Sequence, residues 1–246
     1  MRSVPSPSHR RRQVAAAVAA ALLAASAAAG AAASPVLDVD RIEVAGTERT
    51  PASEVVRAAG VVRGDALVTV DAAGAAGAVE ALPWVERAAV RRRWPGTLVV
   101  EVVEREPLAA LAVARDRWVL VDGSGRRLAR VRRPEPGLVA VRGLERPARG
   151  PLAEPVDRSG QGALELVDLL PSAVRFRQPR VAVQRGGDLV CKVRTVGEAH
   201  AVARLGRPER LREKVTALAT ILESSDLRGV SSIDLRVPIA PVLTRT

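Results

Sequence analysis

Few side chains in this sequence have the chemistry that catalysis or metal binding requires. The only imidazoles are those of His9 and His200, and the only thiol is that of Cys191. A Ser/His/Asp or Cys/His site would depend on His200, but no serine lies in a G-x-S-x-G motif. His200 and Cys191 lack the spacing of a zinc site, and the acidic residues are scattered among arginines. The sequence therefore predicts no catalytic residue, no metal site and no cofactor.

The single cysteine also excludes an internal disulfide bond. Cys191 lies in the run DLVCKV, which is typical of a strand. We therefore expect a small buried side chain at this position rather than a nucleophile.

Arginine gives the chain its other candidate chemistry, the binding of phosphate. The formal net charge is +11, and VRRRWPGTLVVEVVERE at 90–106 places Arg92 and Trp94 just before a Pro-Gly pair. This pattern fits either a basic grip on nucleic acid or the corner of a β-hairpin. Aromatic residues make up only 2% of the chain, so base-stacking platforms are scarce. Because arginine is abundant and lysine is rare, codon usage explains the charge better than selection for phosphate binding.

The N-terminal segment indicates where the chain lies. Residues 14–33 carry no charge over 20 positions, enough for a helix to cross a hydrocarbon core of about 30 Å. The basic run HRRR at 9–12 predicts a cytoplasmic tail at 1–13 and a single-pass type II protein of the cell membrane, by the positive-inside rule. A cleaved secretory signal is one alternative, since the segment is rich in alanine, and an Ala-rich tail on a cytosolic protein is another. The anchor and the cleaved signal both place the bulk of the chain outside the cytoplasm, where proteins rarely meet nucleic acid.

The next part of the chain has the pattern of a compact two-layer α+β unit. A strand-like run comes first, then two helical segments, then two more strands. Thr50 and Asp71 are suited to cap the two helices, which we expect to end at Gly60 and before Pro83. In order, the predicted segments are 37–46, 51–60, 71–82, 84–94 and 97–106.

The last two of these strands form a predicted hairpin. Pro95-Gly96 suits the centre of a type II turn, but that turn does not match the twist of a hairpin, so a corner looser than two residues is the alternative. We expect Trp94 to pack at the corner and the neighbouring arginines to face solvent or an acidic partner. Alternation along the second strand puts three apolar side chains on one face, where they should fill the core. These are Leu98, Val100 and Val102.

A second pattern follows Pro107. It combines two predicted hairpins, with turns at 122–125 and 186–187, and a helix at 207–223 with an apolar face. The chain closes with a strand in which Ile233, Leu235 and Val237 alternate. The nearby Pro238 and Pro241 fit an edge strand better than a central one.

Several stretches resemble the FtsQ/DivIB family of bacterial cell-division proteins, in particular the actinobacterial type. They are VDRIEVAGTERTPASEVVRAAGVVRGDALVTVD, VEALPWVERAAVRRRWPGTLVVEVVEREPLA, WVLVDGSG and the closing IDLRVP. The resemblance implies an α+β protein with one N-terminal transmembrane helix. It also implies a POTRA domain (β-α-α-β-β) at 37–107 and a mostly antiparallel β-domain with helices at 108–246.

The resemblance further implies a function. Members of the family are non-enzymatic bitopic scaffolds of the divisome, which link early and late division proteins at the septum and recruit FtsB/FtsL-like coiled-coil partners. Partner binding is expected in the terminal strand and at the POTRA hairpin, with no nucleic acid and no small-molecule substrate. Residues 224–246 contain none of the aromatic anchors that some relatives carry there. The alternative function is a POTRA module of a secretion or envelope-assembly system. The candidate partner-binding residues are Ile233, Leu235, Arg236, Val237, Arg92 and Trp94.

Overall fold

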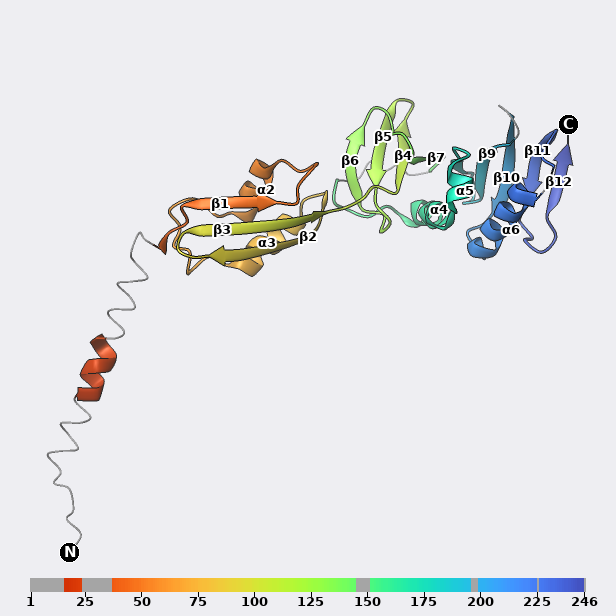
Figure 1. The fold of residues 1–246 in the computed structure, drawn as a ribbon. Coiled ribbons are helices and arrows are strands. Elements are labelled where there is room, and N and C mark those ends of the chain that lie inside the picture. The colour runs from red at the N-terminus through yellow and green to blue at the C-terminus, as the bar shows by residue number, and fades with distance from the viewer. Residues whose placement is uncertain (1–15, 24–36, 145–150, 196–198, 225, 246) are drawn as a thin grey trace, which may run out of the picture. The chain divides into compact units, whose positions relative to one another are not determined.

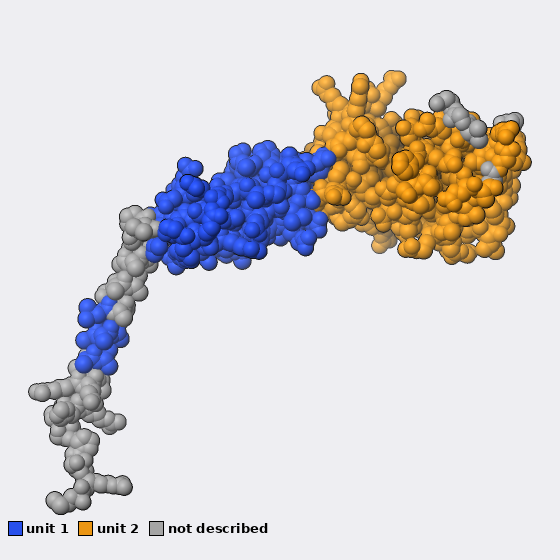
Figure 2. Space-filling model, in the orientation of Figure 1, with its two compact units in different colours: residues 1–104 blue, residues 105–246 orange. Residues whose placement is uncertain are grey.

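The computed structural model describes residues 16–23, 37–144, 151–195, 199–224 and 226–245. The chain divides after Glu104 into two compact units, which we call unit 1 and unit 2 and which Figure 2 colours separately. Residues 16–23 are helical, but within the described ranges no helix is long and apolar enough to cross a membrane. The rest of the predicted anchor at 14–33, and the whole predicted tail at 1–13, lie outside the described residues.

Unit 1 has the predicted order of strand, helix, helix, strand, strand (Figure 1). Its three-stranded sheet has the order β1-β3-β2, with β1 parallel and β2 antiparallel to β3. The parallel pairing requires a crossover between β1 and β3, and the two helices provide it. The elements are β1 (Arg41–Ala45), α2 (Ala52–Ala59), α3 (Ala72–Glu80), β2 (Val85–Arg93) and β3 (Thr97–Glu104).

Local sequence signals set the end of α2 and the start of α3. The predicted cap of α2 by Thr50 is wrong, because Pro51 occupies the cap position and no side chain caps this helix. Helix α2 ends at Gly60, whose φ of 67° lies in the left-handed region that glycine adopts without strain. Helix α3 begins after Asp71, whose carboxylate accepts a hydrogen bond from the Gly74 N–H at 3.0 Å. Both helices cover the face of β3 that carries the predicted core residues Leu98, Val100 and Val102, which are at most 5% exposed. That part of the prediction is confirmed.

The corner of the β2–β3 hairpin differs in part from the prediction. The loop consists of residues 94–96, since Arg93 pairs with Thr97, and the peptide bond before Pro95 is cis. The loop is therefore longer than two residues, in agreement with the prediction of a corner looser than a two-residue turn. Trp94 is 54% exposed rather than packed into the core, because it lies beyond the last residue pair of the hairpin.

Unit 2 contains a nine-stranded mixed sheet in the order β12-β11-β10-β9-β8-β7-β4-β5-β6. Five of the neighbouring pairs are antiparallel and three are parallel (β4 with β7, β7 with β8, β10 with β11), so the sheet is mostly antiparallel. Two strands, β12 and β6, end the sheet. The strands are β4 (Ala109–Ala114), β5 (Arg117–Val121), β6 (Arg127–Val131), β7 (Val139–Arg142), β8 (Arg180–Val183), β9 (Leu189–Arg194), β10 (His200–Gly206), β11 (Val230–Asp234) and β12 (Val242–Arg245).

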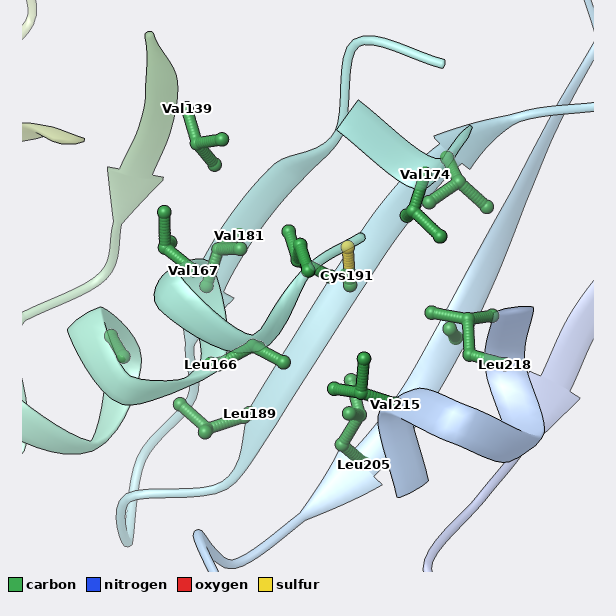
Figure 3. Packing of buried hydrophobic residues seen from close by; sticks show 14 of the residues in the cluster. Val139, Leu166, Val167, Val174, Val181, Leu189, Cys191, Leu205, Val215 and Leu218 are labelled. Atoms are coloured by element: carbon green, nitrogen blue, oxygen red, sulfur yellow. The ribbon is translucent and has the colours of Figure 1, made fainter. Parts of the chain in front are cut away.

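Helices α4 (Arg158–Leu169) and α6 (Leu211–Ser224) pack on this sheet, with the short α5 (Ser172–Arg175) between them in sequence. Figure 3 shows their apolar side chains meeting those of the central strands. Cys191 lies in this layer with 0% exposure, as predicted, and burial raises the pKa of its thiol to about 12. The core therefore consists almost entirely of Val, Leu, Ile and Ala, as the shortage of aromatic residues requires. Residues shown together are Leu166, Val167, Val181, Leu189, Leu205, Val215 and Leu218.

Candidate interaction surfaces

The terminal strand region does not lie as the sequence predicts. Ile233 and Leu235 are 0% exposed, because β11 is not the edge of the sheet. The chain turns after Asp234 and returns as β12, which pairs antiparallel with β11 and forms the edge instead. Both residues belong to the core of unit 2, so they cannot contact a partner directly while the unit is folded. The prediction that the strand ending in IDLRVP forms the edge of the sheet is therefore wrong, because the next strand, β12, forms it.

An exposed apolar strip runs from the β11–β12 connection into β12. Val237, Ile239 and Val242 are 55%, 82% and 60% exposed, and we call these three residues the terminal strip. Among the strands that the structure describes, β12 is paired on one side only, with β11 (Figure 1). Isolated exposed apolar residues are common, but three within six positions beside an edge strand are typical of an interaction site.

Arg236 lies at the base of this connection and is bound within the unit. Its guanidinium contacts the Asp234 carboxylate at 2.6 Å, and its N–H donates to the same carboxylate at 3.0 Å. The hydrogen bond from Arg236 lowers the pKa of Asp234. This pair therefore shapes the turn out of β11, while the Arg236 side chain stays 63% exposed beside the terminal strip.

The arginines of the β2–β3 hairpin are also bound within their own unit. Arg92 donates from Nε to the Leu67 carbonyl at 2.9 Å and from Nη2 to the Val70 carbonyl at 2.6 Å. Arg93 forms an ion pair with Glu43 at 2.6 Å, and Arg91 lies 3.5 Å from the Glu101 carboxylate. All three arginines are nevertheless exposed, as predicted, so these contacts lie on the surface of unit 1, and contact with a partner stays a prediction. Trp94, the other residue predicted for this hairpin, is 54% exposed.

Glu104, the last residue of β3, forms a clamp that sequence reasoning missed. Its two carboxylate oxygens accept hydrogen bonds from three consecutive backbone N–H groups, those of Glu48 (3.1 Å), Arg49 (2.9 and 3.2 Å) and Thr50 (2.7 Å). Partial burial would raise the pKa of Glu104, but these hydrogen bonds outweigh it and the pKa is lowered. The guanidinium of Arg49 lies 4.7 Å from the centroid of the Trp84 ring. The loop that leads into α2 is therefore held by the sheet.

The next residue, Arg105, forms the equivalent contact in unit 2. Its guanidinium lies 2.8 Å from the Asp122 carboxylate, and both side chains are largely buried. Asp122 also accepts hydrogen bonds from the Ser124 N–H and hydroxyl and from the Arg126 N–H, which closes the turn between β5 and β6. Glu104 and Arg105, which are adjacent and opposite in charge, thus each stabilise a loop or turn of a different unit.

Among the described residues, His200 and Cys191 do not form a site; His9 lies outside the described residues. His200 is exposed and pairs with Arg194 across β10 and β9, whereas Cys191 is buried opposite Ala203. Over the described residues, no group of three or more His, Cys, Asp or Glu side chains could hold a metal ion.

Comparisons with known proteins agree with this architecture. The family profile described as "POTRA domain, FtsQ-type" matches residues 37–105, which include every element from β1 to β3. A cell division protein FtsQ of Streptomyces collinus is 33% identical over 229 residues, covering 83% of this chain and 77% of that protein. The chain belongs to the FtsQ family of cell division proteins.

Two other FtsQ proteins are similar to smaller shares of their own length. FtsQ of Corynebacterium glutamicum is 37% identical over 111 residues, which cover 45% of this chain and 49% of that relative. FtsQ of Mycolicibacterium smegmatis is 29% identical over 203 residues, which cover 82% of this chain and 57% of that relative. The alignment with the corynebacterial FtsQ thus spans about half of that protein's length.

Proposed function

We propose that this FtsQ-family chain is a non-enzymatic, bitopic scaffold of the divisome. It links early and late division proteins at the septum and recruits coiled-coil partners of the FtsB/FtsL type. The observation that carries the proposal is the combination of the unpaired side of β12 with the exposed Val237, Ile239 and Val242 of the terminal strip.

Strand addition is the binding mode that this surface supports. An edge strand presents backbone N–H and C=O groups at the spacing of a β-ladder, so an extended partner segment can pair with it without any change in the sheet. The terminal strip supplies apolar area beside those groups. Burying three such side chains contributes on the order of 1.5–3 kcal/mol each in transfer free energy, before the cost of association is subtracted.

The proposed topology uses the N-terminal segment. Residues 14–33 are the membrane anchor, residues 1–13 lie in the cytoplasm, and the POTRA domain at 37–107 and the β-domain at 108–246 lie outside it. The uncharged run of 20 positions behind a basic cluster supports this assignment. In this arrangement Trp94, at the tip of the POTRA hairpin, is available for a second contact with other division proteins.

Binding measurements on charge-substituted variants test the recruitment proposal. We expect Ile239→Glu and Val242→Glu each to weaken binding of a purified FtsB/FtsL-like partner from the same organism by about tenfold or more, because a carboxylate must be desolvated in the interface. Val62→Glu is the matched control, since Val62 is 63% exposed but belongs to unit 1. Circular dichroism and thermal unfolding should show that all three variants remain folded.

Full partner binding by the Ile239→Glu/Val242→Glu double variant would exclude the terminal strip as the docking surface. Equal loss for Val62→Glu would show that the effect is one of general charge and would argue against strand addition at β12.

A further inference from the structure

The opposite end of the sheet in unit 2 carries a second, basic surface. A hollow of about 770 Å³ lies where the β4–β5 hairpin meets the end of β6. Its apolar wall comes from Val113, Trp118 and Val131, and its rim carries exposed arginines with Asp116 as the one acidic lining residue. The rim arginines are Arg117, Arg130 and Arg132.

Two of these arginines differ from the others described above. Arg117 and Arg132 are exposed and form no ion pair with another residue in the part of the chain that the structure describes. By contrast, Arg93 and Arg236 each lie 2.6 Å from a carboxylate. In the described residues the charges of Arg117 and Arg132 are therefore not neutralised by an ion pair, which favours an anionic ligand beside these two side chains.

The strand beside the hollow is itself an edge. β6 is the last strand of the sheet order, and β5 is its strand neighbour. At the start of β6, a short stretch of the same chain, residues 153–155, already pairs with its outer side. The Arg127 N–H donates to the Glu154 carbonyl at 3.0 Å, and the Ala153 N–H donates to the Arg127 carbonyl at 2.8 Å. The bridge between Arg126 and Pro155 completes this short pairing, which extends no further along β6 in the described residues.

We propose that the β6 edge is a second docking site, which binds an extended acidic segment of a partner protein. The segment continues along β6 the pairing that residues 153–155 begin. Its apolar side chains cover Val131 and the edge of Trp118, and its carboxylates lie against Arg117 and Arg132. Alternating acidic and apolar residues match this surface, because alternate side chains of a strand point to opposite faces. The site is independent of β12, so two partners can bind the sheet at once.

A synthetic peptide tests this proposal on the purified full-length protein. The probe is a fluorescently labelled peptide of four Glu-Val repeats, and its binding is measured by fluorescence anisotropy at low and at physiological salt. We expect saturable binding that weakens as salt rises, and a loss of about tenfold or more in the Arg117→Glu/Arg132→Glu variant. The Arg57→Glu/Arg87→Glu variant is the matched control, because it changes the net charge equally at exposed positions of unit 1.

Three further measurements distinguish strand addition from general charge attraction and from lipid binding. The same peptide with N-methyl groups on alternate residues cannot complete a ladder and should not bind, and a Lys-Val peptide should not bind either. Vesicles of phosphatidylglycerol should bind both double variants to the same extent. Equal binding of the N-methylated peptide would overturn strand addition. Loss of vesicle binding only in Arg117→Glu/Arg132→Glu, without peptide binding, would overturn the peptide in favour of a lipid headgroup. Equal peptide binding by both double variants would overturn the site.

Discussion

Glu104 offers a sharp test of how unit 1 is held together. Both of its carboxylate oxygens are used, since Oε1 accepts from Thr50 and Oε2 accepts from Glu48, with Arg49 contacting both. In Glu104→Gln, one oxygen becomes an NH₂ group that faces backbone N–H donors. Hydrogen bonds to a charged group contribute about 1.5–3 kcal/mol, and the partial exposure of this site lets water recover some of that. We therefore expect a net loss of about 1–2 kcal/mol.

The same clamp makes a prediction about pH. The pKa of Glu104 is lowered in the folded state, so the folded protein binds its proton less readily than the unfolded chain does. The stabilisation is therefore complete above the unfolded pKa of about 4.3 and is lost as pH falls through the lower folded value. The difference between the native protein and Glu104→Gln should accordingly be largest near pH 7 and should shrink below about pH 4.

Hydrogen exchange measured by mass spectrometry on the purified chain reads this contact directly. The amides of residues 48–50 should exchange about 5–30 times faster in Glu104→Gln at neutral pH, which corresponds to 1–2 kcal/mol. Glu101→Gln is the control, because Glu101 is an exposed strand residue whose ion pair with Arg91 spans 3.5 Å. Unchanged exchange at 48–50 in Glu104→Gln, or a stability difference from the native protein that does not shrink between pH 7 and pH 3, would refute the clamp.

Three other variants or reagents test the fold. Ile233→Arg should destabilise unit 2 by about 3–5 kcal/mol in chemical unfolding, because it places a charge at a position with 0% exposure. Val242→Arg, at an exposed position, should change the stability by less than about 0.5 kcal/mol. Equal effects of the two variants would contradict the order of β11 and β12. Asp71→Ala should cost about 1 kcal/mol in thermal unfolding through loss of the α3 cap, and an unaltered melting temperature would show that the cap is dispensable. The Cys191 thiol, whose pKa is raised to about 12 by burial, should react with a disulfide reagent at pH 8 only after unfolding, so a rate like that of free cysteine would place it at the surface.

Local signals in unit 1 predicted its fold well. The cap at Asp71, the stop at Gly60 and the alternation along β3 each depend on residues within a few positions of one another. The order of five elements therefore followed from the sequence alone, and the family resemblance led to the same domain.

The contacts of the arginines could not be predicted in this way. Arg92 binds carbonyl groups 22 and 25 residues earlier in the chain, and every residue has a carbonyl group, so no residue type marks the partner. The Glu104 clamp could not be predicted for the same reason, since Glu104 binds backbone N–H groups more than 50 residues away in the chain. Arg91, Arg92 and Arg93 are exposed, as the run of charges predicts, but the run does not reveal which carbonyl or carboxylate group each of them contacts.

The terminal strand shows a second limit of prediction from the sequence, which concerns the position of a strand within its sheet. Alternation at Ile233 and Leu235 predicts that one face is buried, and the structure agrees, but alternation says nothing about whether a neighbour lies on each side of a strand. The true edge, β12, is four residues long and follows two prolines, so its own pattern is too short to recognise. The parallel pairings within the nine-stranded sheet join distant segments and were not predicted either.

The central claim, a division scaffold that acts through the β12 edge, is tested most directly in dividing cells. Native cells depleted of the protein would express fluorescent fusions of the native chain and of the Ile239→Glu/Val242→Glu variant, and septum formation would be scored. We predict that the native fusion gathers at the septum and restores division, while the folded variant fails to recruit the FtsB/FtsL-like partner and leaves septa incomplete. Uniform envelope fluorescence of the native fusion, or normal septa in cells depleted of the protein, would contradict the account.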